Sequence, residues 1–156
     1  MENAVIKMVD EHYESASDME KVIMYIAGRG KNAGKEKLLK CRGRGVSSKA
    51  AKVPGQMAAV QKAFGKAEKR RMYHMIVSFP EDMRDAKAIQ KAADKISDML
   101  FENYQVFYGI HISKNNWHIH YAINAVSYKT GKKWHQSKKE FEGMKKEIIL
   151  AACPLF

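Results

Sequence analysis

Three histidines that lie close together in the sequence could hold a metal ion. They are His111, His118 and His120, half of the six histidines of this 156-residue chain. Residues 105–112 and 117–126 alternate in polarity on either side of four polar residues, which predicts a β-hairpin. The pleat then places all three imidazoles on one face. Neutral imidazoles that converge suit a divalent metal and leave open positions for substrate oxygens.

The alternative is a pair of half-buried strands with incidental histidines on a solvent face. One histidine would favour that interpretation, whereas three on one predicted face favour a metal site. His74 and Ser78 share the polar face of a further predicted strand and could border the site, although structural roles stay open for both. Asn124, on the face of His118 and His120, could bond a ligand or phosphate, or could close the strand end.

The positive charge of the chain is concentrated in one segment. The net charge is +11, but residues 28–72 hold 14 Lys or Arg and two acidic residues, a net of +12, so the remainder is at −1. Such a concentration indicates a surface for a polyanion. A solvated basic loop and an anionic membrane partner are alternatives. Nucleic acid is favoured because the segment lacks a strongly amphipathic helix that bears aromatic residues.

Length and composition predict a single soluble domain over residues 1–156, with residues 28–72 as a basic DNA-binding insert. The chain is 46% hydrophobic and 29% charged, values that are typical of globular proteins. It has no apolar run of membrane-spanning length and no signal-peptide layout at its start, so we expect a cytoplasmic protein. Cys41 and Cys153 have no C-x-x-C partner and are expected to be reduced thiols.

Helical spacing of apolar residues predicts four helices. Two of them have the capping-box spacing at their start, in Ser17 with Glu20 and in Ser137 with Glu140. The helices are expected at residues 18–27, from Pro54 onward, after Asp85 and after Ser137.

Strands are predicted at residues 4–9 and 73–79, before the histidine hairpin. Residues 28–48 are glycine-rich and basic, so we expect a loop there, with one helical turn around residues 35–40. Helices that return between strands, together with a hairpin, indicate an α+β fold. We expect a mostly antiparallel central sheet with helices packed on one face and the histidine hairpin on the other.

Three stretches resemble the relaxase or mobilisation-nuclease family of conjugative and mobilisable plasmids, within the HUH endonuclease class. Residues 111–124 resemble its three-histidine motif, and residues 73–80 resemble its second conserved strand. Met24-Tyr25-Ile26 resembles the segment that bears its nucleophilic tyrosine. The likeness extends over residues 4–141 and departs from the family at Ser113, where an acidic residue is usual.

The resemblance implies an enzyme that nicks DNA and transfers the cut strand. Tyr25 would form a covalent 5′-phosphotyrosine and release a 3′-hydroxyl. A divalent metal on the three histidines, Mg or Mn first and Zn as an alternative, would polarise the phosphate. The substrate would be single-stranded or extruded origin-of-transfer DNA, with accessory DNA-binding proteins as further partners. Tyr25 is preferred over Tyr13 for its motif position and for Arg29 and Lys31, which could favour the phenolate.

Basic and aromatic side chains near these motifs are candidates for DNA binding. Trp134, beside two lysines, could stack on bases or could be a partly buried anchor. The candidates are Arg29, Lys31, Arg42, Arg44, Lys69, Arg70, Arg71, Lys132, Lys133 and Trp134. Two other functions stay open. One is an HUH replication-initiation or transposase-type nuclease, against which three rather than two histidine ligands argue, and the other is a non-catalytic DNA-binding protein stabilised by its metal.

Overall fold

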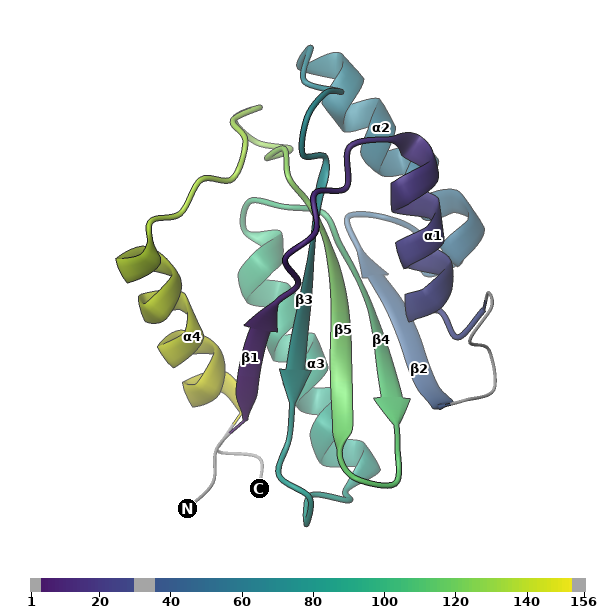
Figure 1. The fold of residues 1–156 in the computed structure, drawn as a ribbon, viewed down its shortest axis with the longest axis vertical. Helices are drawn as coiled ribbons and strands as arrows, with labels where there is room; N and C mark the ends of the chain where they lie inside the picture. Colours follow the sequence, from purple (N-terminus) through teal and green to yellow (C-terminus); the bar gives the residue numbers. More distant parts are fainter. Residues whose placement is uncertain (1–3, 30–35, 153–156) are drawn as a thin grey trace.

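Five strands form one antiparallel sheet through the centre of the molecule (Figure 1). The computed structural model describes residues 4–29 and 36–152. The spatial order is β1-β3-β5-β4-β2, and every neighbouring pair is antiparallel. The strands are β1 (Val5–Met8), β2 (Lys37–Arg44), β3 (Met72–Ser78), β4 (Val106–Ile112) and β5 (Trp117–Asn124). The predicted α+β fold with a mostly antiparallel sheet is confirmed.

Helices pack on both faces of this sheet (Figure 1). One face holds the larger core, formed with α3 and α4, and the other holds a smaller core with α1 and α2. The helices are α1 (Ala16–Ile26), the 3-10 helix η1 (Ala50–Lys52), α2 (Val53–Ala63), α3 (Ala86–Phe101) and α4 (Lys138–Ala152). Within the described residues, no helix combines the length and apolar character needed to cross a membrane.

Strand alternation separates these two cores, as predicted. In β5, Ile119 and Tyr121 are buried against α3 and α4, whereas Ala122 packs with α1 and α2. His118 and His120 share the side of Ala122, because side chains alternate along a strand. The expectation of packed helices on one face and the histidine hairpin on the other is confirmed, and α1 and α2 additionally cover part of the histidine face.

The helix starts follow local capping. Ser15 caps α1 with its hydroxyl, which accepts a hydrogen bond from Asp18 N at 3.0 Å, and the Asp18 carboxylate accepts one from Ser15 N at 3.3 Å. The predicted start at Ser17 is therefore two residues late, because aspartate replaces glutamate in the box. The predicted caps of α3 and α4 are present, at Asp85 and at Ser137 with Glu140.

The expectation of a loop over residues 28–48 is wrong for its second half, because residues 37–44 form β2. This strand lies at the sheet edge and pairs with β4 alone, with an irregularity between Leu38 and Lys40. Lysines and arginines are common on edge strands, where they oppose pairing with other chains, so basic composition hides the strand pattern. Cys41 in β2 is a free thiol, as expected, and Cys153 lies outside the described residues.

Candidate metal centre and active site

The β4–β5 hairpin brings the three predicted metal-binding histidines together. His111 lies directly opposite His118 in the strand register, and His120 lies opposite Gly109. The ring centroid of His120 is 4.4 Å from that of His111 and 4.9 Å from that of His118. His111 and His120 are nearly buried, with 4% and 3% of their surface exposed. The three imidazoles therefore lie close together at a largely buried position.

Two of these histidines each use one ring nitrogen for a hydrogen bond that fixes the ring. His111 Nε2 donates to the carbonyl oxygen of Ile26 at 2.9 Å, and His120 Nδ1 lies 2.8 Å from His74 Nε2. We call these the outer nitrogens, and the nitrogens that remain, His111 Nδ1 and His120 Nε2, the inner ones. His120 Nε2 is buried and has no hydrogen-bond partner among the described residues. Such an atom is rare in proteins and fits a metal ligand.

His74 and His120 are both neutral at pH 7. Burial first, and then the nearby His111, lowers the pKa of His74 to about 4. Burial first, and then the surrounding histidines, lowers the pKa of His120 to about 2. A metal binds the neutral imidazole, so these shifts favour ligation by His120. His74 borders the centre, as the strand alternation suggested.

A carboxylate that the sequence analysis did not select, that of Glu36, completes the group. Glu36 precedes β2, in which Leu38 pairs with His111. Its Oε2 lies 2.7 Å from His118 Nε2 and 3.3 Å from His111 Nδ1. One donor atom from Glu36 and one from each of the three histidines all lie within 4.8 Å of one another. The sequence did hold a signal, because Glu36 is one of only two acidic residues among residues 28–72.

Ser113, which stands where the family it resembles usually has an acidic residue, closes the hairpin turn. Its hydroxyl donates to Asn116 O at 2.5 Å and accepts from Asn116 N at 3.2 Å. Arg84, from the loop before α3, donates to the carbonyl oxygens of Ser113 and Lys114 at 3.4 and 3.0 Å. The turn between the histidine strands is therefore held by a hydroxyl and a guanidinium group.

Tyr25 lies in the last turn of α1, beside the histidines. Its ring centroid is 5.3 Å from that of His120 and 5.5 Å from that of His111. His74 follows at 6.4 Å. Segments more than eighty residues apart in the sequence thus form one site, which joins the predicted nucleophile to the predicted metal ligands.

Electrostatics hold the Tyr25 hydroxyl in its protonated form. Burial first, and then the negative charge of Glu36, raises the pKa of Tyr25. The direction of this shift is opposite to the one expected from the basic neighbours Arg29 and Lys31, of which Lys31 lies outside the described residues. Tyr13, the second choice for the nucleophile, is 6% exposed and forms a β-bridge with Met72. Burial is also the main reason that its pKa is raised to about 12.

Gly109 allows α1 to approach the histidine strands. A Cβ atom at this position would lie 2.1 Å from the carbonyl oxygen of Ile26, which is far inside van der Waals contact. The same carbonyl accepts the hydrogen bond from His111, and Ile26 directly follows Tyr25. Glycine inside a strand often marks such a close backbone approach, so the sequence carried this signal as well.

The other two polar candidates on this face behave differently from each other. Ser78 pairs with His118 in the register of β3 and β5, so it borders the centre. Asn124 is fully buried at the other end of β5, and its side-chain amide makes four hydrogen bonds within the protein. Asn124 therefore has a structural role, which is the alternative that the sequence left open.

Three of the arginines proposed to bind DNA are engaged within the protein. Arg42 and Arg44 form ion pairs with Asp94 and Asp98 of α3, at 2.9 and 3.0 Å, on the face opposite the histidines. Arg71 is 8% exposed and donates from Nε to Gln61 Oε1 at 2.7 Å. Arg71 is therefore corrected from a DNA-binding to a structural residue, and the ion pairs of Arg42 and Arg44 favour a structural role for these two side chains as well.

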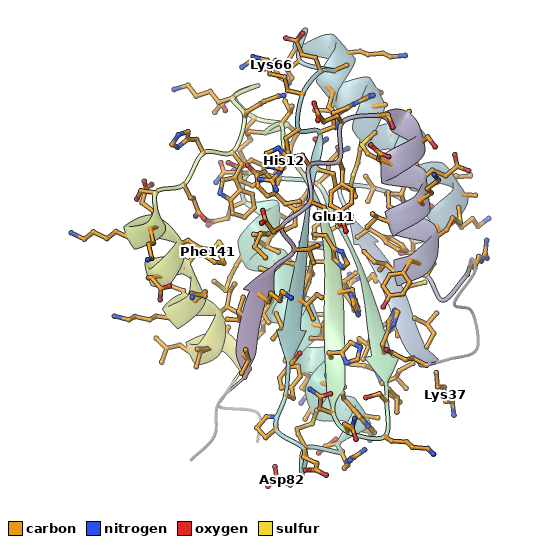
Figure 2. The ribbon with its side chains drawn as sticks, viewed as in Figure 1. Glu11, His12, Lys37, Lys66, Asp82 and Phe141 are labelled. Atoms are coloured by element: carbon orange, nitrogen blue, oxygen red, sulfur yellow. The ribbon has the colours of Figure 1, made fainter. Side chains whose placement is uncertain are left out.

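The remaining basic candidates lie at two places. Arg29 is exposed directly after α1, close to Tyr25 in the sequence. The others gather at the end of the molecule away from the hairpin, where Lys66 is labelled in Figure 2. There, Lys66 Nζ donates to Gly131 O at 2.5 Å, and Lys133 Nζ donates to Glu68 O. We define the lysine cluster as Lys66, Lys69, Lys132 and Lys133, and Arg70 lies beside it over the Tyr73 ring at 4.3 Å.

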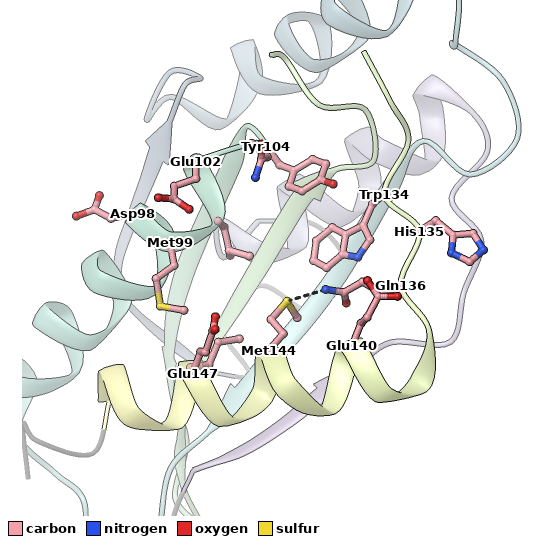
Figure 3. A pocket seen from close by; sticks show the side chains of 13 residues that line it. Asp98, Met99, Glu102, Tyr104, Trp134, His135, Gln136, Glu140, Met144 and Glu147 are labelled. Atoms are coloured by element: carbon pink, nitrogen blue, oxygen red, sulfur yellow. Dashed lines mark hydrogen bonds between the residues drawn. The ribbon is translucent and has the colours of Figure 1, made fainter. Parts of the chain in front are cut away.

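Trp134 is buried on the other side of the sheet. It is 7% exposed, and its ring stacks on Tyr104 at 5.0 Å and contacts Tyr73 at 5.1 Å. It lines a hollow of about 590 Å³ between α3 and α4, together with Tyr104 and Met144 (Figure 3). The expected stacking of Trp134 on bases is therefore wrong, and its role is that of a core anchor. This hollow is separate from the histidine centre.

Comparisons with known proteins agree with this arrangement. Residues 25–149 match the family described as "Relaxase: MobA/VirD2-like, nuclease domain". The chain is also similar to "Protein rlx" of Staphylococcus aureus, with 29% identity over 84 residues. That alignment covers 54% of this chain and 27% of the relative, so the chain matches about a quarter of the relative's length.

Proposed function

We propose, from the premise that this chain belongs to the MobA/VirD2-like relaxase nuclease family, that it cuts one DNA strand at an origin of transfer. The cut strand would stay attached to Tyr25 as a 5′-phosphotyrosine. The observation that carries this proposal is the contact of the Tyr25 ring with His120 and His111, at 5.3 and 5.5 Å. Residues 1–156 would act as one nuclease domain in plasmid mobilisation.

In the proposed reaction, the Tyr25 oxygen bonds to the scissile phosphorus while the bond from phosphorus to the 3′-oxygen breaks. The tyrosine gives up its proton, and the 3′-oxygen leaves as a hydroxyl after taking up a proton. A divalent cation held by the three histidines would polarise a non-bridging phosphate oxygen. His74 and the Ile26 carbonyl hold two of the imidazoles in place through their outer nitrogens. The phosphotyrosine conserves the bond energy for rejoining the strand.

The donor set bears on which cation is bound. Mg²⁺ prefers oxygen ligands and keeps several waters, whereas imidazole nitrogen suits transition metals. Three histidines therefore favour Mn²⁺ or Zn²⁺ over Mg²⁺ at this centre.

The proposed DNA path runs from Tyr25 toward the lysine cluster. Arg29 would contact phosphate near the cut, and Lys69, Lys132 and Lys133 would contact the backbone at the far end. The length of β5 between His118 and Asn124 corresponds to about 20 Å at about 3.3 Å per residue. This length spans about six nucleotides at about 3.4 Å each. Arg70 beside the cluster and accessory DNA-binding proteins would extend this contact.

A covalent-adduct assay tests the proposal. The protein is incubated with a labelled oligonucleotide from the origin of its own plasmid and with Mn²⁺, Zn²⁺ or Mg²⁺, and adducts are separated on a denaturing gel. We expect an adduct with wild type and with Tyr13→Phe, and a loss of at least about 1,000-fold with Tyr25→Phe.

Two results would contradict parts of the proposal. If wild type binds the oligonucleotide but forms no adduct with any of the three cations, the protein is a non-catalytic DNA-binding protein. If Tyr25→Phe forms the adduct as wild type does, another residue is the nucleophile. A replication-initiation or transposase-type nuclease would instead cut a replication origin or an element end in preference to the origin of transfer.

A further inference from the structure

Glu36 enters the histidine group from a different strand than the histidines themselves. It precedes β2, which pairs with β4 on the side away from β5. This pairing places Glu36 beside His111. Its side chain is 31% exposed, whereas those of His111 and His118 are 5% and 12% exposed. Glu36 therefore forms the solvent side of a space that the imidazoles close from within.

A carboxylate near a metal centre can either orient a histidine ligand or bind the metal itself, and the atoms that Glu36 contacts distinguish these two roles. Residues that orient metal-binding histidines bond to the outer nitrogen, as the Ile26 carbonyl does for His111 and His74 does for His120. Glu36 Oε2 instead meets His111 Nδ1 at 3.3 Å, which is the inner nitrogen of that ring. An orienting residue would not occupy the space in which the ligand nitrogens converge.

The separation of the donor atoms also fits a shared cation. Donors about 2.1 Å from a metal lie about 3.0 to 3.4 Å apart in octahedral or tetrahedral arrangements. The distance of 3.3 Å between Glu36 Oε2 and His111 Nδ1 already falls in that range. The 2.7 Å hydrogen bond between Glu36 and His118 Nε2 would open by a few tenths of an ångström.

The charges around Glu36 point the same way. It lies in a segment with 14 Lys or Arg, yet among the ion pairs of the described residues it joins His111 and His118 and no lysine or arginine. Imidazole binds a metal in its neutral form, so three histidine ligands would offset none of the charge of a divalent cation, whereas a carboxylate supplies one negative charge. We infer that Glu36 is the fourth protein ligand of this centre, which makes it a three-histidine, one-carboxylate site.

This inference rests on the proposed metal-dependent function, and metal binding by the purified chain tests it without DNA. Co²⁺ is the probe, because the intensity and position of its visible absorption report the number and type of ligands. We expect Glu36→Gln to weaken Co²⁺ binding by at least about 10-fold and to change the visible spectrum. Glu68→Gln is the matched control, since it removes the same charge from the same basic segment and should bind Co²⁺ as wild type does.

Three outcomes would overturn the ligand role of Glu36. The first is a Glu36→Gln variant with wild-type affinity and spectrum, and the second is weaker binding with an unchanged spectrum, which would make Glu36 an orienting residue. The third is an equal loss in Glu68→Gln, which would make the effect one of net charge. Thermal unfolding of each metal-free variant verifies that it is folded. If Glu36→Gln binds like wild type while wild type still forms the DNA adduct, this inference fails and the proposed function stands.

Discussion

Two groups of buried polar side chains lie on the same face of the sheet, at opposite ends of β5, and they differ in hydrogen bonding. At the hairpin end, His120 Nε2 is buried without a partner among the described residues. At the other end, Asn124 is equally buried and every hydrogen-bonding position of its amide is filled. The first group has unused binding capacity and the second has none.

The Asn124 group is a closed network of long-range partners. Asn124 Oδ1 accepts from Gln61 Nε2 and from Val126 N, both at 3.0 Å. Its Nδ2 donates to Gln105 Oε1 at 2.8 Å and to Met57 O at 3.2 Å. A buried network that is fully satisfied fixes how helix α2 and the strands pack. Strand alternation alone would have assigned Asn124 and His120 to the same site.

The difference between the two groups shows how roles can be assigned to polar residues that share one face of a sheet. A pattern of alternation tells which polar residues share a face, but the role of each depends on partners from elsewhere in the chain. Asn124 is satisfied by α2 and by the residue before β4, whereas the histidines receive a carboxylate from the edge of β2. Unsatisfied buried atoms, rather than shared faces, mark the candidate binding site.

The largest expected effect follows from removing the unpartnered nitrogen. His120→Ala should lower Mn²⁺ or Zn²⁺ affinity by more than about 100-fold, with a matching loss of nicking. The free energy of unfolding of the metal-free protein should fall by about 1–3 kcal/mol, because His74 Nε2 loses its buried hydrogen-bond partner, while removal of the unpartnered His120 Nε2 offsets part of this loss. Calorimetric titration and thermal unfolding measure both quantities.

The control for this change is His135→Ala, because His135 is exposed and borders the hollow on the opposite face of the sheet. It should leave metal affinity and stability at wild-type values. If His120→Ala binds the metal with wild-type affinity, His120 is not a metal ligand and the metal site does not lie at the hairpin.

The next effect should appear at the other end of β5, and in stability alone. Asn124→Ala leaves Val126 N, Met57 O and Gln105 Oε1 without the partners they have in wild type. We expect the free energy of unfolding to fall by about 2–4 kcal/mol, while metal affinity stays within about 2-fold of wild type. Urea unfolding measures the first quantity, and Asn115→Ala in the exposed hairpin turn is the control. Unchanged stability with weakened metal binding would show that the two groups are one site.

The sequence predicted best where periodicity and local capping decide the structure. β3, α3, β4 and β5 follow from alternation and from the Asp85 cap, and the convergence of the histidines follows from the short turn between the last two strands. β2 was missed because its edge position tolerates a basic, glycine-rich composition. Glu36 was missed for the same reason, since its contact with the histidines depends on the pairing of β2 with β4.

Side-chain roles that depend on packing against another helix or strand could not be predicted from the sequence. The segment around Trp134 is basic, yet its indole is buried between Tyr73 and Tyr104. Arg42 looks like a DNA contact in a segment of net +12, but Asp94 of α3 lies beneath it. Local charge predicts a polyanion surface for a segment as a whole, whereas tertiary packing decides which of its side chains reach that surface.

The smallest expected effect is on DNA affinity, and it compares two arginines that lie on opposite faces of the sheet. Arg29→Ala and Arg42→Ala remove the same charge, but Arg29 is exposed after α1 and Arg42 pairs with Asp94 on the opposite face. For single-stranded DNA, Arg29→Ala should lower affinity by about 2- to 5-fold and reduce the salt slope by about 0.7, as expected for one lost phosphate contact. Arg42→Ala should leave both quantities unchanged, because its guanidinium group is held by α3. Fluorescence anisotropy at several salt concentrations measures them, and equal losses in both variants would mean that net charge, rather than one face, sets the affinity.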